Sequence, residues 1–150
     1  MDESKSILLD AFADEFGTDI VFGRTTFKVN DTKSEKMFSI FNSVLFKNKL
    51  PVIPVKCMEY FKICETDSGI YNKYRQPEDE LYVNPPETIY GMHSDIILNK
   101  IFKYDEPLRF AKEEVIYLNL SKLTGASFPL IAATLCHEMI HSYDRHFGEY

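Results

Sequence analysis

Two histidines and a glutamate with metal-site spacing lie near the end of this sequence, in the run His137-Glu138-Met139-Ile140-His141. Residues four apart lie on one face of an α-helix, about one turn apart, so the two imidazoles can point at a single cation. The glutamate directly after the first histidine can reach a water molecule on that cation. This H-E-x-x-H arrangement is typical of zinc hydrolases, in which the histidines bind Zn²⁺ and the glutamate is the general base.

The motif requires a helix, and the flanking residues predict one. Ser127 is a suitable N-cap, Pro129 falls in the first turn, and Gly148 is a suitable stop. On a helical wheel the polar sector contains Leu130, Thr134, Glu138, His141, Asp144 and Arg145, and the apolar face contains Cys136, Met139, Ile140, Tyr143 and Phe147. Because buried ionisable groups are costly without partners, we expect the polar sector to face a cleft, a metal or both. The alternative to metal binding is that the two histidines lie on a solvated helix face.

The composition is that of a folded protein. Apolar residues make up 45% and aromatic residues 14% of the 150 residues, and these values argue against disorder. At this length we expect one domain over residues 1–150. The formal charge of −6 results from 17 Lys and Arg against 23 Asp and Glu. This charge, with no basic segment in the sequence, gives no support to a nucleic-acid-binding surface.

The cysteines and the N-terminus bear on the compartment. Cys57, Cys64 and Cys136 form no C-x-x-C pair, which favours a reducing, cytoplasmic or other intracellular location over a secreted disulfide scaffold. We expect all three to be packing thiols, with Cys136 on the side of its helix away from His137. The sequence shows neither a signal peptide nor a stretch of 18 apolar residues, so we expect no membrane insertion.

The hydrophobic pattern predicts an α+β fold. We expect helices over 4–16, from Thr32 for roughly 15 residues and over 127–147, with strands over 19–29, 52–63, 95–99 and 115–120. Thr32 and Glu35 form a capping-box pattern. Residues 66–95 read as a long loop whose tyrosines either line a cleft or pack on the surface, and one of them could stabilise an oxyanion. His93 in this loop is expected to be a surface or hydrogen-bonding residue and not a ligand.

The order of the motifs resembles the SprT-like family of zinc metallopeptidases, related to the protease domain of Spartan. The resemblance covers about residues 36–148 and leaves residues 1–30 as an N-terminal extension. It rests on Phe41-Asn42 with Phe46, on Asn48-Lys49-Leu50-Pro51, on the strand Ile116-Tyr117-Leu118-Asn119 and on the run Thr134-Leu135-Cys136-His137-Glu138-Met139-Ile140-His141. It implies a zincin-like fold, with a small mixed sheet packed on helices and the motif on a buried C-terminal helix.

The resemblance also implies roles. His137 and His141 would bind Zn²⁺, and Glu138 would be the base that hydrolyses a protein or peptide substrate. In hydrolases of this kind an edge strand beside the active helix commonly holds the substrate by strand addition. Nucleic acid as a partner follows from family analogy alone.

The family usually supplies a third zinc ligand from a His-Gly segment shortly after the helix. His146 matches a helix-end position and not that ligand, because it lies about 180° from His137 on the wheel. Asp144 is better placed to orient His141 than to bind the metal.

Two other functions remain open from the sequence. One is a non-catalytic structural or interaction module with a degenerate peptidase fold, for example a component of a viral or other large assembly. The other is a fold stabilised by zinc without catalysis.

Overall fold

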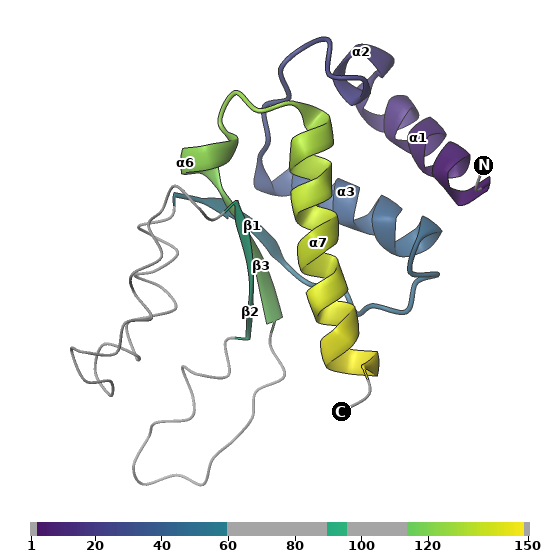
Figure 1. Ribbon diagram of the computed structural model, residues 1–150, viewed down its shortest axis with the longest axis vertical. Coiled ribbons are helices and arrows are strands. Elements are labelled where there is room, and N and C mark those ends of the chain that lie inside the picture. The colour runs from purple at the N-terminus through teal and green to yellow at the C-terminus, as the bar shows by residue number, and fades with distance from the viewer. Residues whose placement is uncertain (1–2, 60–89, 96–113, 149–150) are drawn as a thin grey trace, which may run out of the picture.

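The computed structural model describes residues 3–59, 90–95 and 114–148, which form a small mixed α+β arrangement. Helices α1, α2, α3 and α7 lie together on one side of a three-stranded sheet (Figure 1). The helices are α1 (Glu3–Phe16), α2 (Thr18–Val21), α3 (Asp31–Val44), α6 (Leu120–Leu123) and α7 (Phe128–Phe147), and the strands are β1 (Val55–Met58), β2 (Gly91–Asp95) and β3 (Glu114–Asn119). The predicted helices over 4–16 and 127–147 are therefore confirmed within a residue.

The sheet has the order β1-β3-β2, with β1 parallel and β2 antiparallel to the central strand. Ile116 of β3 lies opposite Val55 on one side and opposite His93 on the other. Because side chains alternate along a strand, Glu114 lies on the same face as Ile116, which belongs to the core shared with the helices. Within the described part of the chain, β2 is thus the edge strand beside α7.

Aromatic packing joins the N-terminal helices to the beginning of α7. The Phe128 ring lies 5.1 Å from Phe12, 5.1 Å from Phe27 and 5.5 Å from Phe16 between centroids. Its contacts with Phe12 and Phe27 are edge-to-face, an arrangement that brings the positive edge of one ring to the negative face of another. The position of α7 at its N-terminal end is therefore set by residues far away in the sequence.

The buried face of α7 differs from the predicted apolar face. The apolar residues of α7 that are 2% exposed or less are Phe128, Ile131, Leu135 and Met139. Ile140 and Phe147, which the wheel placed on the apolar face, are each 48% exposed, so that part of the prediction is wrong. Helix α7 packs against both the sheet and other helices. It is therefore rotated about its axis relative to the predicted orientation, and Glu138 and Ser142 are buried in the interface.

The N-terminal half departs from the sequence prediction at two points. No strand forms over residues 19–29, because α2 ends at Val21 and the following segment turns to bring Phe27 into the aromatic cluster. Helix α3 is capped by Asn30 and not by Thr32: the Asn30 side chain accepts a hydrogen bond from the Lys33 backbone N–H at 2.8 Å. Asparagine is among the best N-cap residues, since its oxygen satisfies an exposed backbone donor.

The long predicted loop is wrong at its C-terminal end, where Gly91–Asp95 form β2. Residues 66–89 of that loop, including Tyr71, Tyr74 and Tyr82, lie outside the described residues, as do Cys64 and residues 96–99 of the strand predicted over 95–99. In the described ranges, no helix combines the length and apolar character that crossing a membrane requires.

Replacement of Phe128 by alanine should lower the free energy of unfolding by roughly 4 kcal/mol, because a fully buried aromatic ring leaves a cavity. Phe22→Ala is the matched control, since that ring is 56% exposed, and it should change stability by less than about 0.5 kcal/mol. Urea unfolding followed by circular dichroism measures both. Equal losses would contradict the assignment of Phe128 to the core.

Candidate metal centre

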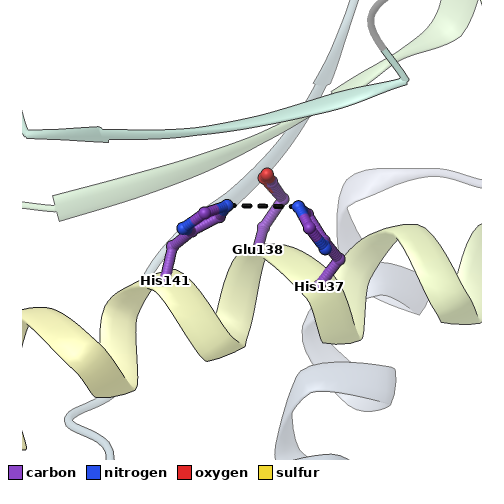
Figure 2. A group of neighbouring side chains, drawn as sticks. All are labelled: His137, Glu138 and His141. Carbon is purple, nitrogen blue, oxygen red and sulfur yellow. Dashed lines mark hydrogen bonds between the residues drawn. The ribbon is translucent and has the colours of Figure 1, made fainter. Parts of the chain in front are cut away.

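Three side chains from one turn of α7 converge on the side of the helix that faces the sheet. His137, Glu138 and His141 extend together toward the strands (Figure 2). Their ligand atoms all lie within 4.8 Å of one another. Within the described ranges, this is the one group of three His, Cys, Asp or Glu side chains close enough to share a cation. The helical spacing of the motif therefore produces the convergence that the sequence predicted.

The two histidines have the separation of a chelating pair. Their Nε2 atoms are 3.1 Å apart, and the rings are nearly perpendicular, at 87°. Two nitrogens bound to tetrahedral zinc at 2.0–2.1 Å lie about 3.3 Å from each other. Both imidazoles are exposed, so a cation and a further ligand can reach them. The donor set and its spacing thus fit zinc without a large rearrangement.

Glu138 is the unusual member, because it is buried and incompletely paired. The residue is 5% exposed, and its Oε2 atom has no hydrogen-bond partner among the described residues. Burial raises the pKa of Glu138 above the usual value for a carboxyl group. The positive charges of His141, His137 and His93 lower it, but only in part. A carboxyl group held this way retains a high affinity for a proton.

Strand β2 lies directly over this glutamate at Gly91. A Cβ atom at this position would be 2.9 Å from Thr134 Cγ2, 3.1 Å from the Tyr117 carbonyl oxygen and 3.3 Å from Glu138 Cγ. Glycine is therefore what allows the strand to approach the motif helix so closely. This approach removes Glu138 from solvent while its two neighbouring histidines remain open.

A second buried carboxylate, that of Glu114, lies farther along the same helix–sheet contact. Its Oε2 atom accepts hydrogen bonds from His93 Nε2 at 2.6 Å and from Ser142 Oγ at 2.9 Å. Its Oε1 atom accepts from Arg145 at 2.9 Å and from His146 Nε2. Burial acts to raise the pKa of Glu114, but the hydrogen bonds from His93, His146 and Ser142 and the charge of His146 together hold it below its usual value. All four histidines of the sequence thus belong to one of two neighbouring glutamate-centred groups.

The Glu114 group is not arranged like a cation site. Its two imidazoles bind different oxygens of the carboxylate, and the guanidinium of Arg145 binds it as well. A fixed positive charge at that distance opposes a metal ion. The helical wheel predicted that His146 would lie apart from His137 and His141, and it does. His93 is a hydrogen-bonding residue with only 12% of its side chain exposed.

The remaining sequence predictions have mixed outcomes. Cys136 packs against the core, and burial raises the pKa of its thiol. The Cys57 thiol, whose pKa burial raises to about 11, lies 3.3 Å from Ser34 Oγ. Both behave as the packing thiols that were expected. The orienting role of Asp144 stays a prediction. Tyr90, a tyrosine of the predicted loop, is 40% exposed, and its ring lies beside the Lys122 ammonium.

Sequence reasoning missed Gly91 and Glu114 as contributors to this region. A signal for Glu114 was present, because a charged residue begins an otherwise apolar strand, Glu114–Asn119, and a buried charge there requires partners. Gly91 gave no comparable signal. Its importance depends on which strand passes over the helix, and this is settled by tertiary structure alone.

Comparison with protein-family models, curated proteins and solved structures finds no match to this chain.

Gly91→Ala should destabilise the protein by roughly 2 kcal/mol, because the added methyl group overpacks the contact between β2 and α7. The double variant with Thr134→Ser removes the closest atom, Thr134 Cγ2, and should recover part of the loss. Thermal unfolding of the single and double variants measures this coupling. Purely additive effects would show that the close approach is not the constraint.

The same substitution should have opposite effects at the two glutamates in metal-free protein at neutral pH. Glu138→Gln removes a carboxyl group whose pKa is raised by folding. Such a group lowers the stability of the protein as the pH rises through its folded pKa. At neutral pH the variant should therefore be more stable than wild type. Glu114→Gln should be less stable by roughly 3 kcal/mol, because it leaves the buried Arg145 contact uncompensated.

The two effects should also differ in their pH dependence. The pKa of Glu114 is lowered by folding, so its contribution is present above the unfolded value of about 4.5 and is lost as pH falls through the folded value. The stability deficit of Glu114→Gln should therefore shrink below pH 4.5. Chemical denaturation of wild type and Glu114→Gln at a series of pH values measures this deficit, and a deficit that does not change with pH would refute the linkage.

Proposed function

We propose that this protein is a zinc-dependent metallopeptidase with a zincin-like fold, similar to the SprT-like family that its sequence motifs resemble. His137 and His141 are the zinc ligands contributed by α7, and Glu138 is the general base. The substrate is a protein or peptide that reaches the exposed side of the two histidines.

The contrast between the two buried glutamates supports this proposal most directly. Glu114 has donors on both oxygens, whereas Glu138 has an oxygen with none among the described residues. A buried acceptor without a partner costs about 1–3 kcal/mol, and a catalytic role or a bound ion is among the recognised reasons for retaining one. The orphaned oxygen belongs to the same turn as two histidines with chelating separation, which points to a group bound through that cation.

When bound, zinc supplies Lewis acidity that makes a water molecule nucleophilic near neutral pH and polarises a peptide carbonyl. His137 and His141 would hold the cation, since their Nε2 atoms lie 3.1 Å apart. Glu138 accepts a proton from the attacking water through Oε2. It then donates that proton to the amine nitrogen that leaves as the peptide bond breaks.

The environment of Glu138 suits this exchange. General acid–base groups work best with a pKa near the operating pH, and burial shifts this carboxyl group in that direction. The edge position of β2 beside α7 suits an extended peptide that adds to the sheet. Both features favour hydrolysis over zinc binding for structure alone.

Glu138→Gln should leave zinc bound and reduce peptide hydrolysis by at least about a hundredfold, since a positioned base contributes roughly 10²–10⁴-fold. His137→Ala and His141→Ala should instead lose the metal. Zinc content by mass spectrometry and turnover of a fluorogenic peptide library measure these two properties separately. Glu15→Gln, which alters an exposed carboxylate paired with Lys36, is the control and should change neither.

Two outcomes would redirect the proposal. Stoichiometric zinc with no hydrolysis would favour a fold stabilised by zinc without catalysis. A purified protein that binds no zinc would favour a structural or interaction module.

A further inference from the structure

Glu114 connects the sheet to the last two turns of α7, where His141 is located. Its partners Ser142, Arg145 and His146 lie on that helix, and its partner His93 lies on β2. Its side chain is 3% exposed, so these contacts operate with little competition from water. Charge-assisted hydrogen bonds are among the strongest in proteins, and they hold the end of α7 in one rotational position.

The cluster touches the segments that carry the metal centre without including any of its residues. Ser142, which donates to Glu114 Oε2, directly follows the ligand His141. His93 lies two residues after Gly91 and so on the same face of β2, and Gly91 is the residue that lies against Glu138. One carboxylate therefore restrains the backbone at His141 and the strand that covers Glu138.

Metal sites are sensitive to restraints of this kind. Ligands must be held within about 0.5 Å of the productive geometry, and groups that orient ligands commonly affect metal affinity by about 10–100-fold. His141 is close to the helix end at Phe147, and helix ends fray unless they are tied down. The chain therefore needs a restraint at this point if its two α7 ligands are to remain 3.1 Å apart.

We propose that Glu114 is a positioning residue of the metal centre: through Ser142 and the strand that carries His93, it preorganises His141 and Glu138 for the cation. This inference rests on the proposed zinc site, but it does not depend on hydrolysis. It assigns to Glu114 a role that the metal-binding motif itself does not include.

The test is zinc affinity, measured by competition with a chromophoric chelator at a temperature where circular dichroism shows every variant folded. Glu114→Gln should weaken zinc binding by about tenfold or more, although no metal ligand is altered. Ser142→Ala is milder, because it removes only the hydrogen bond beside His141, and it should weaken binding several-fold. Glu114→Asp keeps the charge and should restore part of the affinity.

Asn42→Ala is the control for general destabilisation. Asn42 is a buried residue whose side chain bonds the Leu50 backbone at 2.9 and 3.2 Å on another part of the fold. The variant should unfold more easily than wild type in the absence of zinc. Its zinc affinity in the folded state should nevertheless equal that of wild type.

Unchanged zinc affinity in Glu114→Gln would overturn the inference, as would equal losses of affinity in Glu114→Gln and Asn42→Ala. A wild-type protein that binds no zinc would overturn this inference together with the proposed function. A wild-type protein that binds zinc and shows the expected variant affinities, but cleaves no peptide, would support the positioning role while refuting the proposed reaction.

Discussion

The contact between α7 and the sheet is the constraint on which the rest of this structure depends. It buries two carboxylates, those of Glu114 and Glu138, and burial of a carboxylate is costly without partners. At Glu114 the protein supplies those partners itself, from β2 and from the end of α7. At Glu138 it leaves one oxygen without a partner in the described residues. The same interface thus contains one carboxylate, Glu114, with partners on both oxygens, and another, Glu138, with an oxygen that has none in the described residues. Glu138 lies beside two exposed imidazoles.

The residues that hold α7 in place are different from those of the turn that carries His137, Glu138 and His141. The first half of α7 is held by the aromatic cluster around Phe128, and its last turns are held by the Glu114 carboxylate. The turn that carries His137, Glu138 and His141 lies between these two anchors. A helix restrained on both sides of a functional turn can hold an energetically unfavourable group there, because the rest of the helix keeps it in place.

The motif was predictable from sequence because its geometry is local. Helical periodicity alone brings His137 and His141 to one face, whatever the helix packs against. The Glu114 cluster was not predictable in the same way, because it depends on the register that places His93 opposite Ile116 and on the rotation of α7. That rotation also explains why Ile140 is exposed despite its hydrophobic side chain.

Local signals failed for related reasons in the N-terminal half. Residues 19–29 have the composition of a strand, but no sheet edge in the described structure is adjacent to them, and Phe27 is instead drawn into the aromatic cluster. Asn30 caps α3 in place of Thr32 because the helix begins at Asp31, so the exposed donor is the Lys33 backbone N–H, which Asn30 reaches. The tertiary environment selected between alternatives that were nearly equivalent in sequence.

The aromatic cluster has a practical consequence for the boundaries of the domain. The family resemblance begins near residue 36, yet Phe12, Phe16 and Phe27 all pack on the ring that starts the motif helix. A shortened polypeptide designed from the resemblance alone would strip those rings away and leave Phe128 facing water. The segment that lies outside the resemblance is therefore part of the hydrophobic core that positions α7, and a domain boundary at residue 36 would cut through that core.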